Sequence, residues 1–204
     1  MPKRGLLIGL TGSIACGKST VAKILATHGA RHIDADLMAH STYEPGTTGF
    51  KQIIEAFGQE FLSDTGTIDR KALGNLVFSD PAQLKKLTDI VWPLTAGLIR
   101  ETAKAHQESE PERPVVLEAA VLIQAGWHEF TDEIWYVTCP KDQQLQRLMK
   151  RNQLSEDEAR LRISSQKPLP ALTQTVVRNI ENSDTESRLM ENLQDIIHYM
   201  WRDL

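Results

Sequence analysis

The sequence has only two cysteines, no apolar run long enough to span a membrane, and no excess of positive charge. Cys16 and Cys139 lie far apart in the chain, so we expect two reduced thiols rather than a disulfide framework. Because no run of about 18–20 apolar residues occurs, we predict no membrane partner. A net charge of −4 argues against a nucleic-acid partner bound by bulk electrostatics.

The first residues imitate a secretory signal, because Lys3 and Arg4 precede a short apolar stretch. That stretch is short for the apolar part of a signal peptide, and cleavage after it would cut the strongest motif in the chain. We therefore expect a cytoplasmic protein.

The order of the expected elements places the chain in the α/β class, and a length of 204 residues suits one domain. Residues 6–10 are typical of a buried parallel strand, residues 19–28 have the pattern of a helix, and residues 31–34 indicate a second strand joined by a right-handed crossover. Further elements are expected as helices over 82–90 and 94–106 separated by Pro93, strands over 115–117 and 133–137, a helical region over 143–163, a strand near 179–182 and a helix over 186–201.

Residues 12–19 read Gly-Ser-Ile-Ala-Cys-Gly-Lys-Ser between the first strand and the first helix, which is the pattern of a phosphate-binding loop. In such a loop the backbone N–H groups turn inward and hold the β-phosphate. Lys18 places a positive charge on the β- and γ-phosphate oxygens, and Ser19 offers a hydroxyl to Mg²⁺. These features predict a P-loop phosphotransferase that binds ATP and Mg²⁺. The predicted nucleotide-binding residues of this segment are Gly12, Ser13, Ile14, Ala15, Cys16, Gly17, Lys18, Ser19 and Thr20.

Cys16 within the loop has two interpretations. The helix N-terminus could lower the pKa of its thiol and make it reactive. The favoured interpretation is a small residue that the loop tolerates.

Asp34 and Asp36 follow the second strand, so alternation points both to the carboxyl edge of the sheet, where ligands bind in open α/β folds. One carboxylate there could accept the proton of an acceptor hydroxyl. The alternative is a residue that caps the next helix. We favour Asp36 for catalysis and Asp34 for the cap or a supporting role.

Glu118 ends the strand at 115–117. It has two interpretations, a contact to the water shell of Mg²⁺ and a purely structural role, and the sequence favours them equally. Arg147 and Arg151 lie four residues apart on one face of an arginine-rich helix, as expected for a lid that neutralises the transferring phosphoryl group. An exposed, ion-paired face is the alternative, and it is favoured more for Arg160 and Arg162.

Several further blocks occur together at residues 9–12, 33–36, 44–46, 68–73, 77–78, 87–93, 119–127 and 162–166. With these blocks the chain resembles the dephospho-CoA kinase family over nearly its whole length. The resemblance implies transfer of the γ-phosphate of ATP to the ribose 3′-hydroxyl of dephospho-CoA, which gives coenzyme A and ADP in the final step of coenzyme A biosynthesis. It implies a P-loop NTPase fold with a parallel sheet flanked by helices, a helical acceptor-binding insertion and a helical lid.

The resemblance also divides the single domain into parts. The core is expected at residues 1–35, 111–140 and 171–204, the acceptor-binding region at about 36–110, and the lid at about 141–170.

The resemblance assigns roles to single residues as well. Its proposed catalytic base falls on Asp36, which is the residue that the strand pattern also favours. Arg70 matches an arginine of the acceptor region, and Asn182 matches a residue near the adenine pocket. The predicted catalytic residues are Asp36, Lys18 and Arg147; Arg147, Arg151 and Asn182 join the loop in binding ATP; Asp36, His40, Arg70 and Trp92 bind the acceptor; and Ser19 binds the metal.

The chain departs from many bacterial members of this family. Trp92 stands where they have histidine, and His40 stands where they have arginine. Glu118 replaces a usual aspartate and Gln124 a usual glutamate, which leaves the metal role of both positions open. The Trp92-Pro93 form is closer to the kinase domain of the bifunctional animal CoA synthase.

Other functions share some of these residues. A nucleoside or nucleotide kinase is the nearest alternative, because only the acceptor segment separates it. A GTPase switch would need N-K-x-D and D-x-x-G motifs, and the sequence has neither. A third alternative is a binding module that descends from a kinase but has lost activity. The presence of Lys18, Ser19 and Asp36 argues against it. The oligomeric state stays open.

Overall fold

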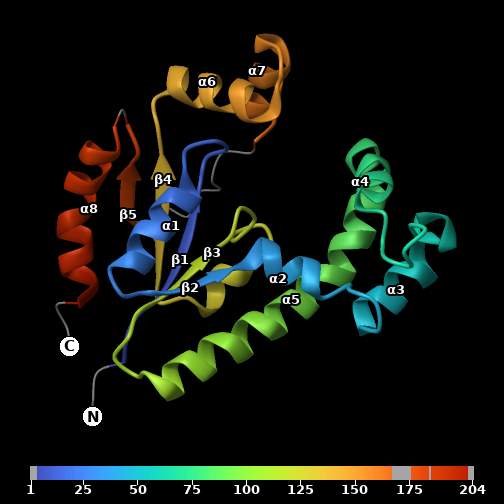
Figure 1. Cartoon of the computed structure of the whole chain (residues 1–204), viewed down its shortest axis with the longest axis horizontal. Helices are drawn as coiled ribbons and strands as arrows, with labels where there is room; N and C mark the ends of the chain where they lie inside the picture. Colours follow the sequence, from blue (N-terminus) through green and yellow to red (C-terminus); the bar gives the residue numbers. More distant parts are fainter. Residues whose placement is uncertain (1–3, 167–175, 184, 202–204) are drawn as a thin grey trace. The chain divides into compact units, whose positions relative to one another are not determined.

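The computed structural model describes residues 4–166, 176–183 and 185–201. Its contacts divide the chain into two compact units (Figure 1). The sheet unit comprises Met1–Ile33 and Ala103–Leu204, and the helical unit comprises Asp34–Thr102.

A five-stranded parallel sheet forms the centre of the sheet unit, with the strand order β2-β3-β1-β4-β5. The first strand, β1, therefore lies between two strands that come much later in the chain. In such sheets ligands bind at the carboxyl ends of the strands. The strands are β1 (Leu7–Gly12), β2 (Arg31–Asp34), β3 (Val115–Glu118), β4 (Glu133–Thr138) and β5 (Val176–Glu181). The predicted fold class is confirmed, and each expected strand forms within two or three residues of its predicted position.

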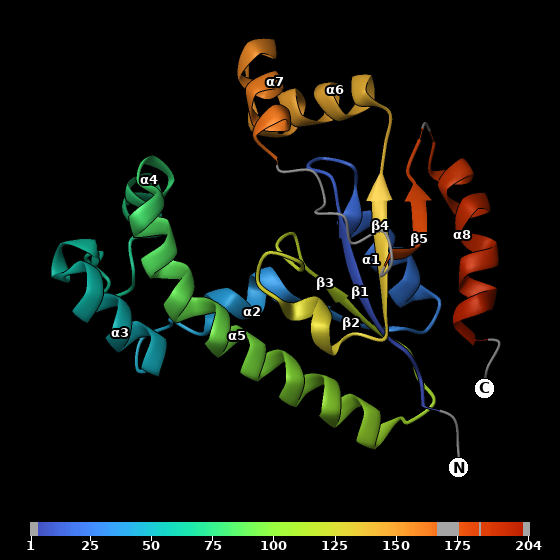
Figure 2. The same cartoon turned by 180° about the vertical axis from the view of Figure 1, so that it is seen from behind.

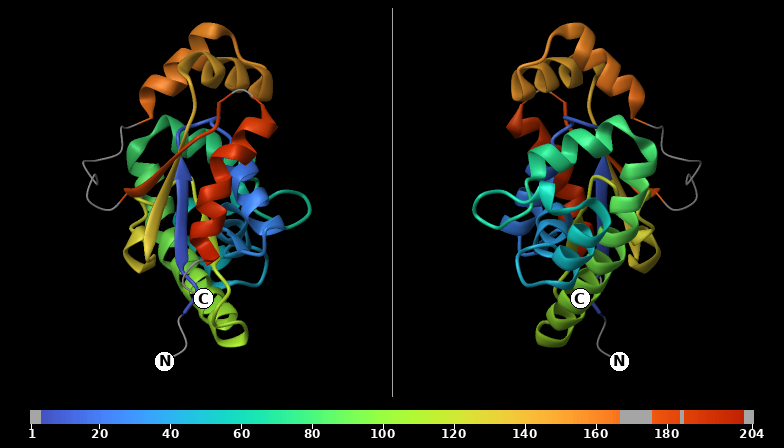
Figure 3. Two further views of the ribbon diagram at one scale, coloured as in Figure 1. Left: turned by 90° about the vertical axis from the view of Figure 1, so that its left-hand side faces the viewer. Right: turned by 90° about the vertical axis from the view of Figure 1, so that its right-hand side faces the viewer.

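Two helices, α1 (Lys18–Thr27) and α8 (Glu186–Trp201), cover one face of this sheet (Figure 3). Their apolar side chains form one buried cluster with the strands, in which Leu25 of α1 and Leu193 of α8 meet Leu10 of β1. These side chains recur at helical spacing on the inner face of each helix, so their burial holds both helices against the sheet.

Helices α6 (Lys141–Asn152) and α7 (Glu156–Ser165) lie beyond the carboxyl end of β4 (Figure 2). The expected helical region over 143–163 is thus two helices. They separate at Gln153, which has a left-handed backbone with φ 53°. Ser155 and Glu158 then form a capping box at the start of α7. A further short 3₁₀ turn, η2 (Trp127–Phe130), precedes β4.

The helical unit is built around its own buried cluster of Ile53, Phe57, Ile68, Leu73, Val77 and Val91. Its elements are α2 (Ala35–Ser41), α3 (Thr48–Phe57), the 3₁₀ turn η1 (Gln59–Phe61), α4 (Arg70–Ser79) and most of α5 (Pro81–Ser109). Side-chain oxygens of Asp34, Thr47 and Asp69 cap the first three helices.

The prediction of two helices separated by Pro93 is wrong, because α5 continues through this proline. A proline inside a helix removes one backbone hydrogen bond and normally costs about 3 kcal/mol. Here Val91 and Ile99 are buried on either side of it. Burial of the apolar face on both sides offsets the cost of the missing bond. Among the described residues no helix is long and apolar enough to cross a membrane.

Candidate nucleotide site and acceptor pockets

The phosphate loop joins β1 to α1 in the sheet unit, as predicted. Ala15 and Gly17 both adopt the left-handed backbone, with φ values of 60° and 82°. A side chain at position 17 would also collide with the amide of Asn182. Both observations explain why the second glycine of the motif is needed here. Alternating right- and left-handed residues turn successive N–H groups to one side, which makes an anion-binding concavity.

Side chains from later segments hold the loop at Ile14. Gln144 of α6 donates from Nε2 to the Ile14 carbonyl at 2.9 Å. The Ile14 N–H donates to Oε1 of Gln166, at the end of α7, at 2.8 Å. The lid helices are therefore hydrogen-bonded to the phosphate loop, and the Gln166 oxygen takes one N–H group of the anion-binding region.

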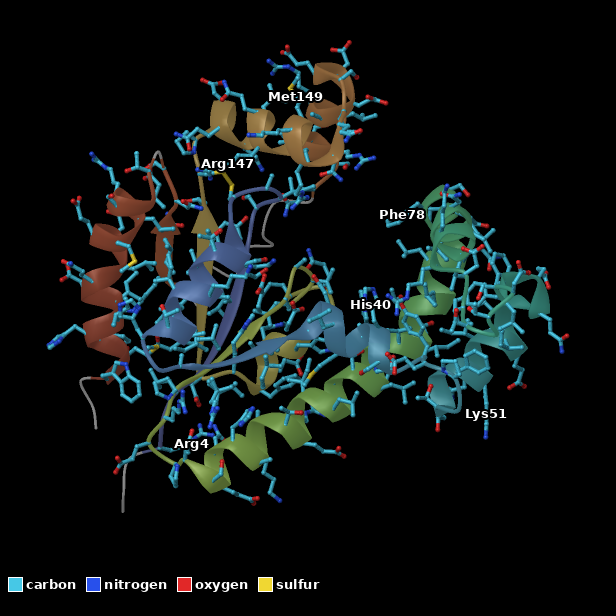
Figure 4. The ribbon with its side chains drawn as sticks, viewed as in Figure 1. Arg4, His40, Lys51, Phe78, Arg147 and Met149 are labelled. Carbon is cyan, nitrogen blue, oxygen red and sulfur yellow. A yellow bond between two sulfur atoms is a disulfide. The ribbon has the colours of Figure 1, made fainter. Side chains whose placement is uncertain are left out.

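Asn182, which follows β5, holds the loop from the other side. Its Nδ2 donates to the Cys16 carbonyl at 2.8 Å. Arg147 of α6 donates from Nη1 to the Asn182 carbonyl at 3.1 Å, and Figure 4 labels it on α6. The structure thus brings two of the predicted ATP-binding residues, Arg147 and Asn182, to the phosphate loop.

The other arginines of the lid are arranged differently. Arg151 is exposed and bonds to its neighbour Asn152. Arg160 forms an ion pair with Glu156 at 2.6 Å, and Arg162 is exposed. The alternative interpretation, an exposed ion-paired face, is therefore confirmed for Arg160.

Glu118 at the end of β3 is 4% exposed and accepts three hydrogen bonds. Ser19 Oγ donates at 2.5 Å and Lys18 Nζ at 3.2 Å, both to Oε1. His32 Nε2, from β2, lies 3.0 Å from Oε2. Burial alone would raise the pKa of Glu118, but the hydrogen bonds from His32 and Ser19 and the charge of Lys18 outweigh it and hold the pKa at about 2. Glu118 is therefore ionised at neutral pH.

The oxygens at this cluster suit a magnesium ion, because Mg²⁺ prefers hydroxyl, carboxylate and water oxygens. Ser19 Oγ and Glu118 Oε1 lie only 2.5 Å apart. The described residues contain no group of three His, Cys, Asp or Glu side chains that could hold a metal by themselves. An ion here would need the phosphates and water for its remaining ligands.

The expectation of two reduced cysteines is wrong in this structure, because Cys16 and Cys139 form a disulfide, drawn as a yellow bond in Figure 4. Their Cα atoms are 5.2 Å apart although the two cysteines are 123 positions apart in the sequence. The sheet explains the pairing, since Gly12 of β1 lies in register with Val137 of β4. Each cysteine follows one of these neighbouring strand ends, which the sequence spacing alone does not reveal.

The predicted acceptor residues gather in the helical unit. Asp34 caps α2, as favoured, by accepting from the N–H groups of Asp36 at 2.9 Å and Leu37 at 3.0 Å. Asp36 and His40 of α2 and Trp92 of α5 line one pocket of about 360 Å³. His40 is labelled in Figure 4.

Burial lowers the pKa of His40, and the charge of Arg70 lowers it further, while the carboxylates of Asp36 and Asp34 act against this. His40 is thus predominantly neutral at pH 7.

Arg70, the first residue of α4, lines a second pocket of about 640 Å³ with Asp69 and the hydroxyl groups of Ser63, Thr65 and Thr67. Its guanidinium lies 5.6 Å from the centre of the Tyr43 ring, which borders both pockets. Hydroxyl donors beside an arginine offer the chemistry that a phosphate group requires.

Comparison with known proteins decides the family. The profile of the family described as dephospho-CoA kinase matches residues 6–187. The dephospho-CoA kinase of Staphylococcus saprophyticus is 34% identical over 197 residues, covering 97% of this chain and 93% of the relative. The enzyme of Geobacter metallireducens is 44% identical over 165 residues, 80% of this chain and 81% of the relative. The solved structure of dephospho-CoA kinase from Campylobacter jejuni has a TM-score of 0.72 at 25% identity and covers 96% of this chain and 97% of its own.

The chain belongs to the dephospho-CoA kinase family. Membership confirms the predicted resemblance and the predicted enzyme activity, the phosphorylation of dephospho-CoA that completes coenzyme A biosynthesis. The roles of single residues in this dephospho-CoA kinase family member stay predictions.

Three residues of the site were not identified from the sequence. His32 contacts Glu118, Gln144 contacts the phosphate loop, and Gln166 contacts the loop from the far end of the lid. Gln166 is the last residue of the block at 162–166, which was a usable signal. His32 and Gln144 lie on ordinary strand and helix positions, so nothing in the sequence pattern marked them.

Proposed function

We propose that this member of the dephospho-CoA kinase family binds ATP with Mg²⁺ at the phosphate loop and transfers the γ-phosphate to the ribose 3′-hydroxyl of dephospho-CoA. The main support is the cluster at the start of α1, where an ionised, buried Glu118 holds both Lys18 and Ser19. The arrangement pre-positions a cation and a hydroxyl at the place where a P-loop takes the phosphates.

In the proposed reaction Asp36 accepts the proton of the acceptor hydroxyl, whose oxygen then bonds to the γ-phosphorus. The bond from that phosphorus to the β,γ-bridging oxygen breaks, and ADP leaves. Lys18 and Arg147 neutralise the charge that develops on the phosphoryl oxygens. Ser19, with Glu118 through the water shell, would hold Mg²⁺, which supplies further neutralisation of the phosphates when it is bound.

For the acceptor, we propose that Trp92 and His40 contact its aromatic and polar groups and that Arg70 contacts its phosphates. The two pockets of the helical unit support this assignment, since these residues line them. We further infer that the enzyme acts in the cytoplasm and has no nucleic-acid partner, in keeping with its net charge of −4.

A coupled assay of ADP release tests the substrate. Dephospho-CoA should be turned over with a much higher kcat/KM than adenosine or nucleoside monophosphates. Turnover of the nucleosides alone would contradict the proposal.

Two variants test the residue roles. Lys18→Ala should lower kcat/KM by roughly a thousandfold or more, because it removes charge that faces the transition state. The exposed Lys23, on the same helix, provides the matched control Lys23→Ala, which should retain activity. Asp36→Asn should lower kcat far more than ATP affinity. A variant that lost ATP binding and kept kcat would place Asp36 in nucleotide binding instead.

A further inference from the structure

The disulfide between Cys16 and Cys139 lies at an unusual place for a structural cross-link. Cys16 is a residue of the phosphate loop, and Cys139 lies between β4 and α6. The bond therefore ties the loop that receives the phosphates to the segment from which the lid begins.

The lid contacts hold the loop at Ile14, and two hydrogen bonds hold the backbone of Cys16 itself. The Cys16 carbonyl accepts from Asn182, and its N–H donates to the Ser13 carbonyl within the loop at 3.2 Å. On either side of Cys16, Ala15 and Gly17 adopt the left-handed backbone. Left-handed Ala15 is unfavourable for a residue with a side chain, so it persists only where the surroundings hold it. The disulfide fixes the Cα atom between these two residues.

The two sulfurs differ in access. Cys16 is 1% exposed and belongs to the buried apolar cluster of the sheet unit, whereas Cys139 is partly exposed and packs against that cluster. Of the two residues, Cys139 is the more accessible from solution, so we take its sulfur as the point of attack. In the cytoplasm, where we infer that this enzyme acts, lasting structural disulfides are rare, and cystines there are usually catalytic or redox-sensing.

From this placement we propose that the Cys16–Cys139 cystine is a thiol–disulfide exchange site that sets the ATP affinity of the phosphate loop. The disulfide form holds the loop ready for the phosphates and binds ATP more tightly than the dithiol form, because less ordering remains to be done on binding. The proposal rests on the proposed nucleotide site.

The reaction partner is a low-molecular-weight thiol. Its thiolate attacks the Cys139 sulfur, the bond between the two cysteine sulfurs breaks, and Cys16 leaves as a thiolate that takes a proton from water. A second thiol attacks the mixed disulfide, which releases Cys139 as a thiol and the small molecule as its own disulfide. Two electrons thus pass from two thiols to the cystine.

The experiment measures binding of a non-hydrolysable ATP analogue with Mg²⁺ to the full chain by calorimetry. No acceptor is added, since dephospho-CoA carries a thiol of its own. The chain is compared in its oxidised form, after reduction with a dithiol reagent, and after reoxidation, with free thiols counted by alkylation and mass spectrometry. We expect the thiol count to rise from zero to two, Kd to rise by roughly fivefold or more, and reoxidation to restore both values.

The variant Cys139→Ser cannot form the cystine and serves as the control. It should bind the analogue with the Kd of the reduced wild-type chain, and the dithiol reagent should not change this Kd. Equal Kd values for the two wild-type forms, or a cystine that reacts only after denaturation, would overturn the exchange site and leave the nucleotide assignment intact. If neither form bound the analogue, both proposals would fail.

Discussion

At the scale of single residues, the most consequential side chain is Glu118, because one carboxylate organises three donors. Its pKa of about 2 means that the buried charge is retained over the whole physiological range. Lys18 thereby has an anionic partner at 3.2 Å before any nucleotide is bound. When the phosphates of ATP bind, Lys18 exchanges the carboxylate of Glu118 for a phosphate. Its ammonium group is already largely removed from water, so this desolvation cost does not arise on binding.

Replacement of Glu118 by glutamine should make folding stability depend less on pH. A carboxyl whose pKa falls from its ordinary 4.5 to about 2 on folding stabilises the protein above pH 4.5, and this contribution disappears as the pH falls toward 2. Its size is on the order of 3 kcal/mol, at about 1.4 kcal/mol for each pKa unit. Denaturant unfolding should therefore show Glu118→Gln less stable at pH 7, with a gap that narrows below pH 4.5.

The exposed Glu101 of α5 offers a matched control. Glu101→Gln should stay close to the wild-type curve at every pH. A gap between wild type and Glu118→Gln that stayed constant down to the acid transition would mean that the ionised carboxylate does not stabilise the fold.

His40 gives a second pH effect, on acceptor binding. Because burial and the charge of Arg70 lower its pKa, His40 carries little charge at pH 7.5. His40→Arg restores a permanent cation in the pocket, so it should lower KM for the anionic acceptor several-fold at pH 7.5. The difference should shrink as the pH falls through the lowered pKa of His40, where the wild-type histidine becomes charged. His198→Arg, on the exposed side of α8, is the control, and an effect of equal size there would point to net charge alone.

At the scale of elements, local sequence signals located most of the secondary structure. The glycine loop between an apolar strand and a helix, and the amphipathic pattern of α8, depend on neighbouring residues only, so they were predicted correctly. The errors came from distant contacts. Pro93 lies inside α5 because tertiary burial of Val91 and Ile99 outweighs a local rule.

The candidate site likewise has some features that local sequence marks and others that depend on distant contacts. Motif spacing predicts roles for Lys18, Ser19 and Asp36, because local sequence marks these positions. The contacts of His32 and Gln144, and the disulfide of Cys16, depend on which strands become neighbours in the sheet. Strand order is a property of the whole chain, so no local pattern could predict these contacts.

The start of α2 provides a prediction at this scale. Asp34 caps the helix on which Asp36 lies, through two backbone N–H groups. Asp34→Ala should destabilise the protein by about 1 kcal/mol and lower kcat, because the first turn that orients Asp36 loses its cap. Asp34→Asn keeps a capping oxygen and should retain most of the activity. Loss of activity in Asp34→Asn as severe as in Asp36→Asn would instead assign the base to the first acid of the pair.

At the scale of the whole molecule, the two units contain different parts of the predicted chemistry. The sheet unit contains the phosphate loop with Asn182 and Arg147, and the helical unit contains both pockets that we propose for the acceptor. Binding of each substrate should therefore respond to changes in one unit only. KM values for the two substrates can be measured separately, which makes the division testable.

Two variants, Asn182→Ala and Trp92→Ala, test this division of substrate binding between the units. The first variant removes the amide that holds the phosphate loop at Cys16, so KM for ATP should rise roughly tenfold, equivalent to about 1.4 kcal/mol, with little change in KM for dephospho-CoA. The second removes one aromatic side chain from the smaller pocket, so KM for dephospho-CoA should rise with little change in KM for ATP. Full saturation curves in both substrates check both variants. If Trp92→Ala raised KM for ATP as much as KM for the acceptor, the helical unit would take part in nucleotide binding, and the division would be wrong.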